Sequence, residues 1–203
     1  MRLSVSRETR GSVSRETLER LEAYHRLLLT WNGKINLISK ADEADIWPRH
    51  VEDCLQLARY VPTNIPIILD IGSGAGFPGL ILAIATDIPT TLVESDARKC
   101  AFLREAARLT AAPATILCSR IESASLPQFP AITARALASV SKLLTLTTPH
   151  LAPGGTLIFP KGARVDTEIA EAETEWTMTI HRHPSQTHNL GTILAITEPA
   201  RVR

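Results

Sequence analysis

The glycine-rich turn at residues 72–79 constrains the fold more than any other part of the sequence, because it joins an apolar run to a helix start. The run at 65–71 is rich in β-branched residues and leucine, which is typical of a strand buried in a parallel sheet. Glycine lets the backbone take a positive φ and approach a ligand closely. The helix expected from Leu80 directs unpaired N–H groups at the turn. This strand–turn–helix unit predicts an α/β fold with a cradle for a nucleotide-like ligand.

Two ligand-binding motifs overlap in this turn. Residues 74–79 fit G-x-G-x-x-G, the dinucleotide fingerprint, and Glu94 follows at about the 20 residues expected for a carboxylate that binds ribose. Residues 70–76 fit D-x-G-x-G-x-G, the pattern of S-adenosylmethionine (SAM) methyltransferases. A carboxylate at Asp70 would repel a pyrophosphate but would suit the cationic ammonium and sulfonium groups of SAM. The sequence therefore favours SAM, with an NAD(P)-dependent oxidoreductase as the alternative.

Length and composition limit the classes of protein to which the chain can belong. The 203 residues suit one domain of ordinary size, and 44% hydrophobic residues indicate a globular chain. The net charge of +1 gives no overall basic field, so nucleic-acid binding must depend on a local patch. We expect no membrane span and no secretory signal, because no apolar run is long enough. Three widely spaced cysteines indicate reduced thiols in a cytoplasmic protein.

Hydrophobic periodicity predicts a helical N-terminal part followed by alternating strands and helices. Residues 4–9 recur as 12–17, and residues 1–13 are expected to form a flexible tail. Residues 14–62 carry two helix-like patterns, the second at 44–60, and are predicted to be an extension packed on the main domain at 63–203. The rest predicts a seven-stranded, mostly parallel sheet with helices on both faces and one antiparallel member. The expected strands are 65–71, 90–94, 115–118, 131–136, 156–159, 176–181 and 192–197.

Four short blocks, in order along the chain, resemble one family of methyltransferases. They are W-N-G-K-I-N-L at 31–37, R-H-V-E-D-C-L at 49–55, the glycine turn with its F-P-G ending at 77–79, and T-A-R-A at 133–136. Together they resemble the RsmG (GidB) family over roughly residues 18–200. Cys54 stands where that family usually has serine, a near-isosteric change.

The resemblance implies a Rossmann-like class I SAM-dependent methyltransferase that acts as a monomer. Its expected reaction is methyl transfer from SAM to ring position seven of a guanine in 16S ribosomal RNA, free or in a small-subunit precursor. By position, Glu94 would hold the ribose, Ile121 and Glu122 the adenine, and Arg135 would lie at the pocket mouth. The full set expected to bind the cofactor is Asp70, Gly72, Gly74, Gly76, Phe77, Glu94, Ile121, Glu122 and Arg135.

The residues themselves are compatible with that reaction. Methylation of cytosine at carbon five needs a cysteine nucleophile, usually after a proline, and no cysteine here follows one. Exocyclic amino groups usually meet an Asn/Asp-Pro-Pro-aromatic motif, which is absent. Position seven of guanine carries an in-plane lone pair and needs no base, so no catalytic residue is assigned with certainty. The loosely spaced histidines predict no metal site. A non-catalytic RNA-binding assembly factor is the second alternative, although Asp70, Gly72, Gly74 and Glu94 are intact.

Five residues are candidates for contact with RNA, and each has a structural alternative. Arg135, in the expected strand at 131–136, either binds phosphate or the guanine edge or pairs with a neighbouring carboxylate. His50 shares a helix face with Asp53, and the two either orient a ligand or form a hydrogen-bonded pair that fixes the extension to the sheet. The remaining candidates, which could equally be solvated cations, are Arg98, Lys99 and Lys161.

Overall fold

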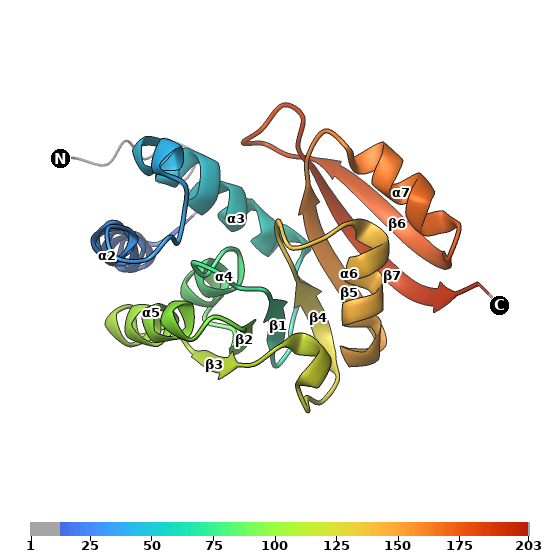
Figure 1. Ribbon diagram of the computed structural model, residues 1–203, viewed down its shortest axis with the longest axis horizontal. Helices are drawn as coiled ribbons and strands as arrows, with labels where there is room; N and C mark the ends of the chain where they lie inside the picture. Colours follow the sequence, from blue (N-terminus) through green and yellow to red (C-terminus); the bar gives the residue numbers. More distant parts are fainter. Residues whose placement is uncertain (1–12, 203) are drawn as a thin grey trace.

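The computed structural model of the chain describes residues 13–202 as a seven-stranded sheet with helices on both faces (Figure 1). The strand order is β3-β2-β1-β4-β5-β7-β6, in which β7 runs antiparallel to β5 and β6 while the other neighbouring pairs are parallel. This confirms the predicted sheet. The strands are β1 (Ile68–Ile71), β2 (Thr90–Glu94), β3 (Ala114–Cys118), β4 (Phe129–Thr133), β5 (Leu151–Lys161), β6 (Trp176–Pro184) and β7 (Thr192–Arg201). The expected N-terminal tail and the first copy of the repeat fall in residues 1–12, outside the described part.

The central strand β1 creates the switch point of the sheet. It pairs in parallel with β2 on one side and with β4 on the other. It begins at Ile68, later than expected, because Pro66 has no N–H to contribute to a ladder. All four of its residues are buried, as the continuous apolar run predicts. In an open α/β sheet, ligands bind beyond the carboxyl ends of the strands at such a switch point.

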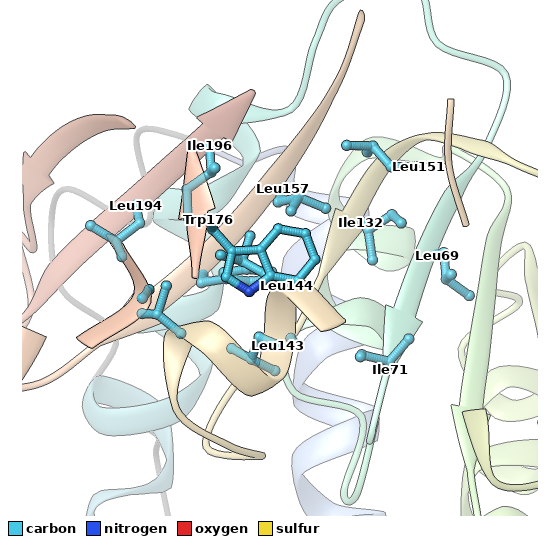
Figure 2. Packing of buried hydrophobic residues seen from close by; sticks show 14 of the residues in the cluster. Leu69, Ile71, Ile132, Leu143, Leu144, Leu151, Leu157, Trp176, Leu194 and Ile196 are labelled. Atoms are coloured by element: carbon cyan, nitrogen blue, oxygen red, sulfur yellow. The ribbon is translucent and has the colours of Figure 1, made fainter. Parts of the chain in front are cut away.

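The two faces of the sheet are covered by different helices. Leu69 and Ile71 point to the face covered by α6 (Val140–Thr147) and α7 (Val165–Glu173), where α6 supplies Leu143 and Leu144 (Figure 2). Trp176 packs into the same cluster. Successive side chains of a strand alternate between the two faces of the sheet. Asp70, which lies between Leu69 and Ile71 in β1, therefore points to the opposite face.

The opposite face carries α4 (Gly79–Thr86) and α5 (Ala97–Leu109), with the N-terminal helix α2 (Arg15–Asn32) packed on them. Tyr24 and Leu28 of α2 share one buried cluster with Leu80 of α4 and Phe102 of α5. The extension therefore shares a hydrophobic core with the main part of the chain. Within residues 13–202, no helix is long and apolar enough to cross a membrane.

The predicted helix at 44–60 is broken into short turns. A 3₁₀ helix (Lys40–Asp45) is followed by a π-helical turn (Trp47–Glu52), the short helix α3 (Asp53–Leu55) and another 3₁₀ helix (Gln56–Tyr60). Proline at position 48 lacks an N–H and clashes with the preceding turn, which explains the break. His50 and Asp53, on either side of the end of this π-helical turn, both contact Arg135 in the loop after β4, as described below.

Candidate functional site

A cavity of about 530 Å³ opens at the carboxyl ends of β1 to β4, beside the switch point. Its volume suits a nucleotide-sized ligand. Its walls are the glycine turn, the ends of β2 and β3, the segment after β4 and part of the N-terminal extension. We call it the first cavity. Of the residues singled out in the sequence, it is lined by His50, Gly72, Gly74, Phe77, Glu94, Lys99, Ile121, Glu122 and Arg135.

The glycine turn holds a shape that other residues resist. The φ angles are 65° at Gly72, 55° at Gly74 and 98° at Gly76. Gly76 lies outside the lining of the first cavity, and a Cβ there would be 2.9 Å from the Cβ of Leu80. Gly76 therefore lets the turn pack closely on α4, and its expected contact with the cofactor stays a prediction.

Asp70 lies beneath the turn and not on the cavity wall. Its side chain is fully buried, and its Oδ1 accepts a hydrogen bond from Thr133 Oγ1 at 2.6 Å. Its Oδ2 has no hydrogen-bond partner among the described residues. The alternation of β1 turns this side chain towards the start of α4, where it packs against Gly79. Asp70 thus supports the turn from below, and its expected role towards the cationic groups of SAM, directly or through water, stays a prediction.

The buried carboxyl of Asp70 makes stability depend on pH. Burial raises the pKa of Asp70 from 3.8 to about 6, against the opposing hydrogen bond from Thr133. The folded state thus holds the proton more tightly than the unfolded state, so this group disfavours folding increasingly as the pH rises from about 4 to about 6. The full cost above that range is on the order of 3 kcal/mol.

Asp70→Asn should therefore gain stability relative to wild type as the pH rises. Urea unfolding of both proteins at several pH values measures the effect, and the difference between them isolates this group from the other titrating residues. We expect the free energy of unfolding of the variant, relative to that of wild type, to rise by on the order of 2 kcal/mol between pH 4 and pH 7. A difference that stays constant over this range would contradict the assignment.

Glu94 at the end of β2 fastens the glycine turn. Its Oε2 accepts a hydrogen bond from the amide of Gly74 at 2.9 Å, and its Oε1 accepts from the amides of Ser95 and Asp96 at 2.7 and 2.8 Å. Such bonds to a carboxylate are stronger than neutral ones. The carboxylate is thereby fixed at the cavity wall, where it can accept further hydrogen bonds from a ligand.

The N-terminal extension supplies a wall that sequence reasoning missed. Leu37, Ile38 and Asp42 line the first cavity. Asn32 shapes this segment, since its Oδ1 accepts from the amides of Leu37 and Ile38 at 2.9 and 3.0 Å, and its Nδ2 donates to Glu43 at 2.7 Å. The signal was present in the block at 31–37, because Asn32 is the last residue of a helix, but the spacing alone does not reveal what the following segment faces.

Phe77 and His50 form a stacked pair on the same side of the cavity. Their ring centroids lie 5.0 Å apart with the planes inclined by 22°. Burial, followed by the charge of Arg135, lowers the pKa of His50 to about 4, so its imidazole is neutral at pH 7. Arg135 Nη1 lies 3.0 Å from His50 Nδ1. Because a guanidinium only donates, Nδ1 accepts and the imidazole hydrogen is on Nε2.

Arg135 lies in the loop after β4 and not inside the strand, because β4 ends at Thr133. Its Nη2 pairs with Asp53 at 3.1 Å and donates to the carbonyl of Arg49 at 3.0 Å. Asp53 is thus a neighbouring carboxylate that pairs with Arg135, and the Arg135 side chain also lines the first cavity. His50 and Asp53 are thus both bound to Arg135, which joins the extension to the end of β4.

A second cavity of about 570 Å³ lies on the other side of Arg135, towards β5 and the loop before β7. The two cavities share the lining residues His50, Arg135, Ala136 and Leu137. Lys161 lines the second cavity, but its Nζ pairs with Glu168 at 2.6 Å and its side chain is only 10% exposed. Lys161 is therefore a largely buried, paired cation and not a solvated one, whereas its expected contact with RNA stays a prediction.

The two remaining cationic candidates are placed differently. Lys99 lines the first cavity, whereas the side chain of Arg98 is 73% exposed, lies outside both cavities and pairs with Asp96 at 3.4 Å. The first cavity also includes Arg120, which the sequence analysis did not single out. Within residues 13–202, no three His, Cys, Asp or Glu side chains are grouped so as to hold a metal ion.

Known proteins resemble this chain over nearly its whole length. A family model described as rRNA small subunit methyltransferase G matches residues 17–193. A protein from Gluconobacter oxydans named ribosomal RNA small subunit methyltransferase G is 51% identical over 94% of this chain and 98% of its own. A protein of the same name from Rhodospirillum centenum is 48% identical over 93% of this chain and 87% of its own.

Solved structures of more distant proteins share the fold. An O-methyltransferase from Bacillus cereus in complex with SAH aligns with a TM-score of 0.58 at 13% identity, over 89% of this chain and 91% of its own. The glycopeptide N-methyltransferase MtfA aligns with a TM-score of 0.59 at 12% identity, over 73% of this chain and 90% of its own. At such identities the likeness shows only the Rossmann-like α/β fold of class I methyltransferases.

Proposed function

Since this chain belongs to the rRNA small subunit methyltransferase G family, we propose that it transfers a methyl group from SAM to ring position seven of a guanine in 16S ribosomal RNA. The observation that carries the proposal is the pair of cavities that meet at Arg135, since a transfer between two substrates needs two adjoining sites. The proposed substrate is the RNA or a small-subunit precursor in the cytoplasm, and the proposed active form is the monomer.

The residues of the first cavity fit SAM. Glu94 offers a fixed carboxylate for the ribose hydroxyls, and Ile121 and Glu122 offer an apolar surface and an acceptor for the adenine. The turn at Gly72 and Gly74 brings the backbone close to the ligand without side chains. SAM supplies an electrophilic methyl group on a sulfonium centre when it is bound.

The second cavity is the proposed site for the target guanine. Ring position seven attacks with its own lone pair, so the protein needs to align the base and to exclude water, not to remove a proton. Arg135 can donate to the guanine edge or to a neighbouring phosphate from its place between the cavities. His50 is neutral and bound to Arg135, so its role in this scheme is to orient that guanidinium.

The test is methyl transfer from labelled SAM to small-subunit RNA, free and in ribosomal particles, with the modified base then mapped. We expect label at a guanine that is cleaved by the chemistry specific for 7-methylguanosine. SAM binding without transfer to any of these RNAs would contradict the proposed substrate, and titration with NAD(P) in place of SAM tests the oxidoreductase alternative.

Glu94→Ala should weaken SAM binding, because it removes the carboxylate that fixes the turn and faces the ligand. A charge-assisted hydrogen bond of this kind corresponds to roughly a tenfold to hundredfold change in affinity. Calorimetric titration of SAM measures it, with Glu105→Ala as the matched control. Glu105 is a carboxylate of α5 paired with Arg108 away from both cavities. Equal affinities for wild type and Glu94→Ala would remove Glu94 from the proposed site.

A further inference from the structure

A largely buried ion pair lies in the wall of the second cavity. Lys161 is the last residue of β5 and Glu168 is in the first turn of α7, and their Nζ and Oε2 atoms are 2.6 Å apart. The two side chains are 10% and 16% exposed. Taking two charges out of water is costly, and the pair offsets that cost only if its remaining donors and acceptors are also used.

Those remaining groups bind one short segment of backbone. Lys161 Nζ donates to the carbonyl of Ala138 at 2.9 Å, and Glu168 Oε2 accepts from the amide of Val140 at 3.1 Å. We call residues 135–139 the wall segment, because it separates the two cavities. Its other end is held by Arg135 through Asp53 and the carbonyl of Arg49. The wall segment is therefore fastened by charged side chains at both ends.

The middle of the wall segment is strained and lies against the glycine turn. Ala136 has a φ of 52°, which a residue with a side chain seldom adopts. Leu137 is 42% exposed, lines both cavities and packs over Gly72, so that a Cβ at Gly72 would lie 2.8 Å from its Cδ1. A strained conformation persists only where the surroundings impose it. The anchors at the two ends can impose it here.

We propose that Lys161 and Glu168 are positioning residues for methyl transfer, which hold the wall segment at the distance from the glycine turn that in-line transfer between the two cavities requires. The inference rests on the proposed function for its chemistry. In this role they act indirectly, although both side chains also line the second cavity. They act through the carbonyl of Ala138 and the amide of Val140, and therefore through Leu137. A misplacement of about 1 Å in such a wall is enough to lower the rate by about a hundredfold.

The test compares Lys161→Met with Arg20→Met in the full chain. Arg20 is a matched control, because its side chain is 15% exposed, pairs with Asp87 at 2.9 Å and donates to the carbonyl of Thr110 at 2.7 Å, outside both cavities. We expect Lys161→Met to lower kcat by about ten- to a hundredfold, with KM for RNA and Kd for SAM changed by less than about threefold. Arg20→Met should lose less stability, because its partner Asp87 is 72% exposed, and should keep kcat. Lys161→Arg, which keeps the cation, should recover most of kcat.

A second variant covers the case in which Lys161→Met fails to fold. In Lys161→Met with Glu168→Gln no unpaired charge is left, and the glutamine oxygen can still accept from Val140, while the anchor on Ala138 is lost. Amide hydrogen exchange of a peptide covering residues 135–142 should be faster in this double variant than in wild type and unchanged in Arg20→Met.

The outcomes separate the two proposals. Loss of kcat in Lys161→Met no greater than in Arg20→Met, or unchanged exchange in the wall segment, overturns the positioning role. A rise in KM for RNA at constant kcat also overturns it, in favour of direct contact between Lys161 and RNA. If wild type itself transfers no methyl group, the proposed function fails, and the exchange measurement still decides whether the ion pair holds the wall segment.

Discussion

Arg135→Ala is expected to lower kcat by about a hundredfold while leaving the chain folded. The side chain lines both cavities and holds one end of the wall segment. Its removal should misplace the second cavity relative to the first and remove a hydrogen-bond donor to the methyl-accepting guanine. The cost in stability is smaller, about 1–3 kcal/mol, because Asp53 keeps hydrogen bonds from Thr187 and Gln56 after the guanidinium is gone. A domain typically has about 5–15 kcal/mol of stability, so the variant should remain folded.

Steady-state kinetics and thermal unfolding of the same preparations measure both effects. Arg26→Ala is the matched control, because Arg26 is an exposed arginine of α2 outside both cavities and should change neither kcat nor stability appreciably. If Arg135→Ala unfolds at room temperature, or keeps full activity, the guanidinium serves only as the ion-pair partner of Asp53.

Gly79→Ala is expected to destabilise the protein by about 3–4 kcal/mol, at or above the upper end of the usual cost of overpacking. A Cβ at this position would lie 2.4 Å from the Cβ of Asp70 and 2.5 Å from Cδ2 of Leu92, both in fully buried side chains. Alanine is favoured over glycine within a helix by about 1 kcal/mol. The collision outweighs that gain because neither β1 nor β2 can move without disturbing the centre of the sheet.

Chemical denaturation measures this change, and Gly162→Ala provides its control. Among the described residues, a Cβ at Gly162 would meet no atom within 4 Å, so this substitution should alter the free energy of unfolding little. Equal stabilities for Gly79→Ala and Gly162→Ala would show that α4 can withdraw from the sheet at no cost.

Local sequence patterns were sufficient to predict the sheet, because neighbouring residues encode the burial of strands and the positions of turns. The apolar run of β1 and the glycines after it predicted a buried strand and a ligand-binding turn. The alternation of strands and helices that follows predicted a mostly parallel sheet. The ends of the strands were predicted less accurately. The pattern at 131–136 continued past Thr133, because alanines are compatible with either a strand or a loop.

The site depended on contacts between distant residues, which spacing does not encode. Nothing in the sequence indicates that Lys161 pairs with Glu168 and holds Ala138, or that Asn32 presents Leu37 to a cavity whose floor is about 40 residues further along the chain. The orientation of Asp70 was missed for a different reason. Its motif predicted a place beside the ligand-binding turn, but the alternation of β1 directs the side chain below that turn.

The wall that the extension contributes has a consequence for the minimal active fragment. A chain cut before β1 would retain every strand, the glycine turn and the wall segment. It would lack Leu37, Ile38, Asp42 and His50 on one side of the first cavity and Asp53 behind Arg135. It would also uncover Leu80 and Phe102, which pack against Tyr24. The shortest unit capable of binding therefore begins no later than α2, and fusion partners or purification tags are best joined ahead of Ser14, the residue that caps that helix.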